Sequence, residues 1–225
     1  MAEDKKWADL TPAEKRQQRY DWWLNPGIKF SSAEAEKNYR ARAQRFIAAY
    51  KVEKADRVPV NLPLGNWPAY LAGTDLHTVT YDYDKLQQVW KKFYDMYETD
   101  VAVTPGMVLP ARVYELMDYK LYSWPGHGLP KTATGIQFVE GEYMMEDEYD
   151  RLIKDPSDFW MRVYIPRVFG AFEPWKTLNP FTSIIEAPGA WFMPYMQPAM
   201  QASARRLIDI GKELTKWAKM LGATW

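Results

Sequence analysis

The feature that most constrains the fold is a set of three short apolar runs separated by stretches of helical character. They read RVPVNL at 57–62, DVAVT at 100–104 and TSIIEA at 182–187, and proline or glycine bounds them. Such runs are typical of strands buried in a parallel sheet. Because strands alternating with helices indicate a parallel arrangement, the sequence predicts an α/β fold.

Capping residues and apolar periodicity predict the helices between these runs. TPAE at 11–14 and SSAE at 31–34 have the form of capping boxes, and DPSD at 155–158 begins a helix expected to reach about residue 169. Apolar side chains at helical spacing extend over 86–97 and again over 204–221, the latter in a last helix expected from about 198 to 221. The basic cluster of Arg40, Arg42 and Arg45 is interpreted as the solvated face of a helix.

A hairpin is predicted on either side of the stretch YKLYSWPGHGLP at 119–130. YKLYSW at 119–124 and GIQFVEGEY at 135–143 alternate in polarity, so two antiparallel strands joined by a loop are expected. The joining segment contains His127, one of only two histidines in the chain. Whether His127 is a catalytic group or a residue of a turn is the question that this stretch raises.

Composition and charge bear on several classes of function. Lys plus Arg and Asp plus Glu both total 29, so the basic excess of a nucleic-acid-binding protein is missing. The chain has no cysteine, which excludes disulfides and thiolate metal sites within it. The first residues are too polar for a secretory signal, and no run of about 18 apolar residues is present. We therefore expect a cytoplasmic protein that binds neither nucleic acid nor membrane.

Four segments, taken in order, resemble the uroporphyrinogen decarboxylase family. They are NYRARAQRFIAAYKVEKADRVPV at 38–60, TDVAVTPG at 99–106, ARVYELMDYKLYSWPGHGLP at 111–130 and DRLIKDPSDF at 150–159. The resemblance implies a (β/α)8 TIM barrel. Such a barrel needs eight strands, and only three parallel strands are predicted here. We expect a helical leader at 1–56 and, at 57–225, the first part of an incomplete barrel. It also implies that Pro-Gly-His-Gly turns a β-arm, which makes His127 a loop residue, and His77 is interpreted in the same way.

The resemblance implies two kinds of enzyme activity, and the residues favour one of them. Decarboxylases of this family have an arginine pair after the first strand, where this chain has NLPLGNWPAYLAG at 61–73 without arginine. They also have an essential aspartate after the second strand, where Gly106 and Met107 stand here. Methyl transfer from a corrinoid donor of the methylcobalamin type is therefore favoured. Decarboxylation of a uroporphyrinogen-like tetrapyrrole and non-catalytic tetrapyrrole binding are the alternatives. Because one of these alternatives is non-catalytic, the sequence does not decide whether the protein is an enzyme.

The expected cofactors and partners follow from the same resemblance. The methyltransferase branch uses zinc held by one His and two Cys, ligands that this chain does not supply and that only a further carboxyl-terminal half could provide. A corrinoid is the possible cofactor, and a small molecule or a corrinoid protein is the possible partner. An incomplete barrel would leave sheet edges unpaired, so a homo-oligomer is also possible.

Candidate substrate-binding residues are expected where the strand-like runs end, since reacting groups of barrels lie at the carboxyl ends of strands. EAPGAWFMPYM at 186–196 also resembles a family segment that carries a substrate-facing tyrosine. Asn and Trp can bind an amide- or pyrrole-bearing ligand, Arg can meet a carboxylate, and no catalytic residue is assigned. The candidates are Asn61, Asn66, Trp67, Thr104, Met107, Arg112, Glu186 and Tyr195.

Overall fold

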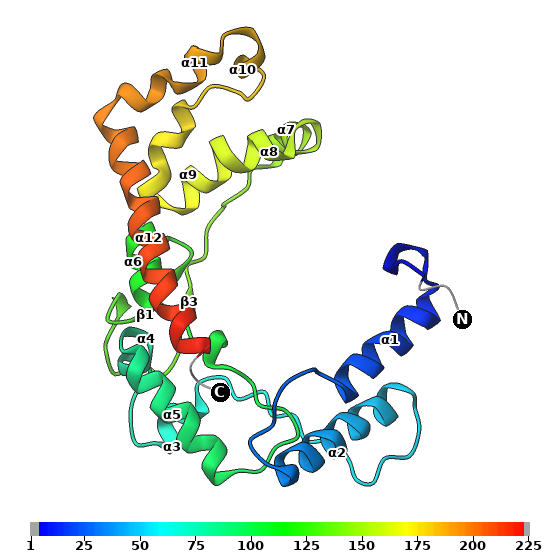
Figure 1. The fold of residues 1–225 in the computed structure, drawn as a ribbon. Coiled ribbons are helices and arrows are strands. Elements are labelled where there is room, and N and C mark those ends of the chain that lie inside the picture. Colours follow the sequence, from blue (N-terminus) through cyan, green and yellow to red (C-terminus); the bar gives the residue numbers. More distant parts are fainter. Residues whose placement is uncertain (1–4, 223–225) are drawn as a thin grey trace. The chain divides into compact units, whose positions relative to one another are not determined.

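The computed structural model describes residues 5–222, apart from the side chain of Met107, and divides the chain into two compact units. Within the described residues, unit 1 comprises 5–63 and 98–103, and unit 2 comprises 64–97 and 104–222. Figure 1 shows the elements of both units coloured along the sequence. The two units meet in the sequence at residues 63/64, 97/98 and 103/104.

Unit 1 is built on two helices, α1 (Pro12–Leu24) and α2 (Ala33–Tyr50), preceded by the 3-10 turn η1 (Trp7–Asp9). The predicted capping box of α1 is confirmed, because Thr11 and Glu14 exchange side chain–backbone hydrogen bonds of 3.2 and 2.8 Å. The second predicted box is wrong in detail. Ser32 alone caps α2, by accepting from the Ala35 backbone N–H at 3.1 Å.

A buried ion cluster ties the end of α2 to the extended segments of unit 1. Arg45 is 7% exposed and binds the carboxylates of Asp56 and Asp100, each at 2.5 Å. The Asp100 side chain is fully buried and also accepts from Arg57 at 2.7 Å and from the Val60 backbone N–H at 2.7 Å. The interpretation of the basic cluster as a solvated face is therefore wrong for Arg45, because its carboxylate partners lie far away in the sequence.

The first two predicted strands are not formed. The runs at 57–62 and 100–104 are extended or irregular, and the backbone hydrogen bond between them is from the Asp100 N–H to the Val60 carbonyl, at 2.9 Å. Pro59, Pro63 and Pro105 lack the N–H that a ladder needs. Apolar composition predicted strands here, but prolines in and beside the runs limit their pairing.

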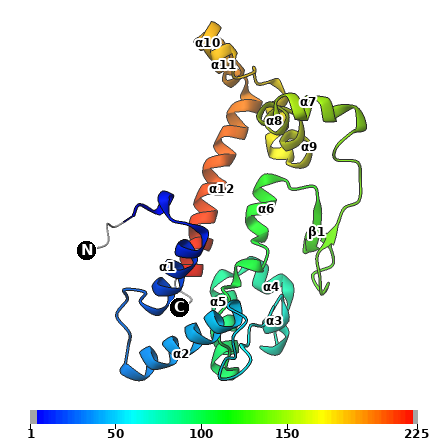
Figure 2. The same ribbon diagram turned by 90° about the vertical axis from the view of Figure 1, so that its right-hand side faces the viewer.

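Unit 2 is mainly helical. Its longest helix, α12 (Pro198–Gly222), packs against α6 (Ala111–Met117), α5 (Tyr83–Met96) and η5 (Gly170–Thr177). Figures 1 and 2 both show α12 beside α6. The helices expected at 86–97 and 198–221 are confirmed as α5 and α12. The other helical elements are α3 (Trp67–Leu71), α4 (Leu76–Tyr81), α5 (Tyr83–Met96), η2 (Pro105–Met107), α6 (Ala111–Met117), η3 (Glu146–Glu148), α7 (Tyr149–Lys154), α8 (Pro156–Phe159), η4 (Trp160–Tyr164), α9 (Ile165–Val168), η5 (Gly170–Thr177), α10 (Ser183–Glu186), α11 (Pro188–Phe192) and η6 (Met193–Met196).

The helix predicted from residue 155 is present but is not a uniform α-helix. It continues from α8 through a π-helical stretch, η4, into α9 and ends at Val168. Pro166 lies in α9, and a proline has no N–H to give to the preceding turn. The wider hydrogen-bonding pattern of η4 directly before it is a known accommodation in helices.

The predicted hairpin is confirmed. Strand β1 (Tyr122–Pro125) pairs antiparallel with β3 (Gln137–Phe138) and parallel with the short β2 (Gly128–Leu129), which gives the order β2-β1-β3. The His127 N–H donates to the Trp124 carbonyl at 2.8 Å, with Pro125 and Gly126 between them. Gly126 has φ +90°, so this is the geometry of a type II turn.

The third predicted strand is a helix. Residues 182–187 contain α10, and Ile185 on it is 86% exposed. The Ser183 N–H donates to the Pro180 carbonyl at 3.0 Å, so local bonds satisfy backbone groups that a strand would have to pair with a neighbour. Across residues 5–222 the sheet has three short strands, and a TIM barrel is not formed. The fold is mostly helical with this small sheet.

Buried apolar residues of unit 2 lie on α4, α5 and the hairpin, and a further core cluster of Val113, Phe172 and Ile210 lies on α6, η5 and α12. Leu86, Val89, Trp90 and Phe93 of α5 are each nearly inaccessible to solvent, which confirms the apolar stripe read from the sequence. Trp124 of β1 is also fully buried. Burying large rings of this kind is the main favourable contribution to the stability of such a unit.

Candidate functional site

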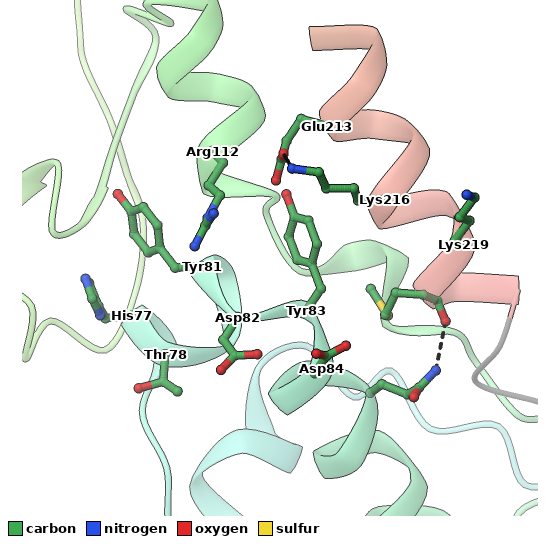
Figure 3. A pocket seen from close by; sticks show the side chains of 12 residues that line it. His77, Thr78, Tyr81, Asp82, Tyr83, Asp84, Arg112, Glu213, Lys216 and Lys219 are labelled. Atoms are coloured by element: carbon green, nitrogen blue, oxygen red, sulfur yellow. Dashed lines mark hydrogen bonds and ion pairs between the residues drawn. The ribbon is translucent and has the colours of Figure 1, made fainter. Parts of the chain in front are cut away.

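A pocket of unit 2 lies between α4, the start of α5, α6 and the end of α12 (Figure 3). Its volume is about 800 Å³, within the range of small-molecule sites. Both acidic and basic side chains line it, together with two tyrosines. The lining residues are His77, Thr78, Tyr81, Asp82, Tyr83, Asp84, Gln87, Arg112, Glu213, Lys216, Lys219 and Met220.

Two capping aspartates place the tyrosines of the pocket. Asp75 caps α4 by accepting from the Thr78 N–H at 2.7 Å, and Asp82 caps α5 by accepting from the Lys85 N–H at 2.9 Å. Asp82 is both the residue that follows the last turn of α4 and the residue that caps the start of α5. Tyr81 therefore closes α4 while Tyr83 opens α5, and both rings flank the guanidinium of Arg112 (Figure 3).

Tyr81 is held by hydrogen bonds on both sides of its hydroxyl. The phenol donates to Glu115 Oε1 at 2.5 Å and accepts from Trp124 Nε1 at 3.1 Å. Burial, together with the Glu115 carboxylate, raises the pKa of Tyr81 to about 12. The ring is consequently a neutral, fixed wall of the pocket at neutral pH.

Tyr83 differs from Tyr81 because its hydroxyl is buried without a hydrogen-bond partner among the described residues. Burial, with the nearby Glu213 carboxylate, raises the pKa of Tyr83. Glu213 is itself 7% exposed, and it is paired with Lys216 at 2.8 Å. An ion pair on α12 thus covers the phenol, and it is this pair that neutralises the buried carboxylate.

The charges of the pocket balance, but they are not all paired. Arg112, Lys216 and Lys219 are basic, whereas Asp82, Asp84 and Glu213 are acidic. Lys216 is tied to Glu213, and Asp82 is engaged as a helix cap. Within residues 5–222, Arg112 has neither an ion pair nor a hydrogen bond, although its side chain points into the pocket (Figure 3).

The two histidines have different positions. His127 lies in the turn after β1, as interpreted, with its ring stacked on Trp124 at 4.2 Å between centroids. His77 lies on α4 at the edge of the pocket, so its interpretation as a loop residue is wrong. Its ring is 4.8 Å from that of Tyr81. Gly126 lies so close to His77 that an added Cβ would be 2.6 Å from His77 Cδ2.

Among the candidates predicted from the sequence, Arg112 lines the pocket and the others with described side chains lie elsewhere. Asn61 belongs to unit 1. Asn66 and Trp67 begin α3, and Thr104 precedes η2. Met107 ends η2, and its side chain lies outside the described residues. Glu186 ends α10 and Tyr195 lies in η6, 6.1 Å from Trp191 between ring centroids.

The sequence interpretation missed the tyrosines and the α12 side of the pocket. The segment YDYD at 81–84 contains the break between two helices. Tracing the apolar periodicity of 86–97 back toward its start, to the capping residue Asp82, could have revealed this break. Nothing local pointed to Glu213, Lys216 and Lys219. Their place in the site depends on packing against elements more than 90 residues earlier in the chain.

Metal and membrane features were sought over the same residues. The described chain contains no group of three or more His, Cys, Asp or Glu side chains placed to hold a metal ion. None of the helices described between residues 5 and 222 combines the length and the apolar character that crossing a membrane would need.

Comparison with models of protein families, with curated proteins and with solved structures gives no match.

Proposed function

We propose that this chain belongs to a protein of the uroporphyrinogen decarboxylase type whose reaction is methyl transfer involving a corrinoid. Support comes first from the ordered segments at 38–60, 99–106, 111–130 and 150–159. The hairpin and its Pro-Gly turn, which the resemblance led us to expect, are present. The proposal includes the expectation that the described helices belong to the amino-terminal part of a (β/α)8 fold.

The charge balance of the pocket is the observation that carries the choice of reaction. A uroporphyrinogen bears several acidic side chains, and binding it requires an excess of arginine or lysine. Here three basic side chains face three carboxylates, and one of the basic groups, Lys216, is already paired. Binding a polyanion in this pocket would bring its carboxylates against Asp82 and Asp84, which have no ion pair among the described residues, and this is unfavourable.

A corrinoid fits this lining better, because its peripheral side chains are mainly neutral amides. Amides need both hydrogen-bond donors and acceptors, and Asp84, Gln87 and Lys219 would supply them. A corrinoid, when bound, supplies a cobalt centre that carries the methyl group. The residues of this chain would bind and orient it, and the neutral phenol of Tyr81 would remain protonated beside it.

The test is a paired titration of the full chain, followed by absorbance, with hydroxocobalamin and with the stable polyanion uroporphyrin. We expect tighter binding of the corrinoid. Asp84→Asn combined with Lys219→Gln should weaken that binding, whereas Lys131→Gln, an exposed loop change outside the pocket, should not. Tighter binding of uroporphyrin would favour tetrapyrrole decarboxylation or non-catalytic tetrapyrrole binding. Absence of corrinoid binding would refute the proposal.

Activity is tested separately with methylcobalamin and a thiol acceptor, in the dark and without oxygen. Loss of the methylcobalamin absorbance that depends on the protein is the expected result. Binding without any such loss would indicate a carrier in place of a methyltransferase.

A further inference from the structure

We propose that Arg112 anchors the carboxylate of a small planar organic acid in the pocket of unit 2. This inference rests on the proposed function in one respect, since such an acid would be the small-molecule substrate of the methyl transfer. The ligand class itself follows from the side chains around Arg112. The Arg112 guanidinium has no ion pair among the described residues and lies between the rings of Tyr81 and Tyr83, with the His77 ring beyond Tyr81 (Figure 3).

Arg112 and Lys219 are the cations of the pocket that have no ion pair among the described residues, and of the two it is Arg112 that lies between the tyrosine rings (Figure 3). Elsewhere in unit 2, Arg162 is paired with Asp158 and Arg167 binds Glu148 at 2.5 Å. Arg112 extends from α6 toward the space between Tyr81 and Tyr83 and makes no such pair within the described chain (Figure 3). A guanidinium presents two parallel N–H donors, which match the two oxygens of a carboxylate.

The aromatic rings around Arg112 favour a flat ligand body. Tyr81 is fixed by its hydrogen bonds to Glu115 and Trp124, and the His77 ring lies against it. Tyr83 provides a second ring across the guanidinium (Figure 3). Rigid rings on both sides of an anchor stabilise a planar group by stacking or edge contacts, with little loss of side-chain freedom.

The carboxylates in the same pocket favour a monoanion over a phosphate. Asp82 and Asp84 line the pocket, and neither is in an ion pair among the residues that the structure describes. A dianion at Arg112 would double the repulsion from these carboxylates together with the attraction to Arg112, whereas the single charge of one guanidinium already balances a singly charged carboxylate. A small acid with one carboxylate satisfies Arg112 at the lowest electrostatic cost.

The experiment measures binding of benzoate and of the isosteric neutral benzamide by saturation-transfer NMR and calorimetry. Benzoate is expected to bind with a dissociation constant on the order of 1 mM, and benzamide much more weakly. Arg112→Gln should weaken benzoate binding roughly ten- to hundredfold, because a charge-assisted hydrogen-bonded pair is lost. Arg112→Lys keeps the positive charge but loses the two parallel N–H donors, so its affinity for benzoate should lie between those of the wild type and Arg112→Gln. Arg206→Gln changes an exposed arginine outside this pocket and should leave benzoate binding unchanged.

Equal binding of benzoate and benzamide, or benzoate binding unaltered in Arg112→Gln, would overturn the inference. Displacement of benzoate by millimolar inorganic phosphate would overturn its choice of ligand class. The corrinoid titration separates the two proposals. Arg112-dependent benzoate binding without corrinoid binding retains the carboxylate site and removes the proposed function, and the converse removes the site alone.

Discussion

Two arginines, one in each unit, show how differently the same side chain is used. Arg45 of unit 1 is almost fully buried and meets carboxylates of Asp56 and Asp100. Arg112 of unit 2 is exposed, points into a pocket and has no carboxylate partner in the described structure. A guanidinium paired with buried carboxylates stabilises the fold, whereas one without a carboxylate partner beside a cavity can bind the carboxylate of a ligand.

The difference arises from the groups around each arginine. Asp100 accepts hydrogen bonds from Arg45, Arg57 and the Val60 N–H, and its side chain is fully buried. Burial opposes its ionisation, but the bonds from the Val60 N–H and Arg57, together with the charge of Arg45, lower the pKa of Asp100. The ion cluster is thus complete without any further partner. In the pocket, Glu213 is paired with Lys216 and Asp82 caps α5, and Arg112 has no carboxylate partner among the described residues.

The largest effect on stability is expected from Asp100→Asn. The change leaves Arg45 buried without its full charge partner, and breaking a buried ion pair costs about 3–5 kcal/mol. Urea unfolding followed by circular dichroism measures it. Glu98→Gln is the control, because that carboxylate is 75% exposed and makes a single 3.4 Å contact with Arg42. A loss below about 1 kcal/mol for Asp100→Asn would contradict the structural role of this cluster.

A smaller loss is expected from Gly126→Ala, which tests whether the turn shapes the wall of the pocket. Gly126 has φ +90°, and an added Cβ would be 2.6 Å from the His77 ring. Backbone strain of this kind costs about 1–3 kcal/mol, and His77 would have to move. Gly135→Ala is the control, since its φ is not positive and its Cβ would meet nothing within 4 Å. Equal unfolding free energies for the two variants would show that the close contact is unimportant.

Lowering the pH should reduce the stability contributed by ion-paired carboxylates, and it should not change the contribution of Arg112, which has no carboxylate partner among the described residues. The hydrogen bond from Arg167 is the main reason that the pKa of Glu148 falls from 4.5 to about 2. A lowered folded-state pKa contributes stability that is full above about pH 4.5 and is lost as the pH falls toward 2. Glu148→Gln should therefore flatten the decline in unfolding free energy over this interval. Glu142→Gln, an exposed change, should keep the wild-type slope, and an identical slope in Glu148→Gln would contradict the prediction.

The smallest effect on stability is expected from Arg112→Gln. An exposed side chain without a partner contributes little to folding, so the unfolding free energy should change by about 0.5 kcal/mol or less. Arg45→Gln, measured beside it by the same urea unfolding, should be far more damaging. A large loss for Arg112→Gln would show that this arginine is a structural group like Arg45, and the contrast between the units would fail.

The sequence predicted those features that depend on neighbouring residues. The Thr11 capping box, the apolar stripe of α5 and the long α12 were all predictable, and so was the Pro-Gly turn after Trp124. The strands expected at 57–62, 100–104 and 182–187 were wrong. An apolar run becomes a strand only when a neighbouring strand takes up its N–H and C=O groups, and here prolines and local turns prevent that pairing.

The site shows the same limit. Arg112 could be singled out from its sequence, but its freedom from any ion pair could not. Local hydrogen bonds, capping and glycine conformation act within a few residues, and the sequence by itself determined them in this protein. Only the tertiary structure decided that Arg45 is buried against Asp100 and that Glu213, whose partner Lys216 is three residues away on the same helix, is buried beside Tyr83, because the burial of a charge depends on groups brought together from distant parts of the chain.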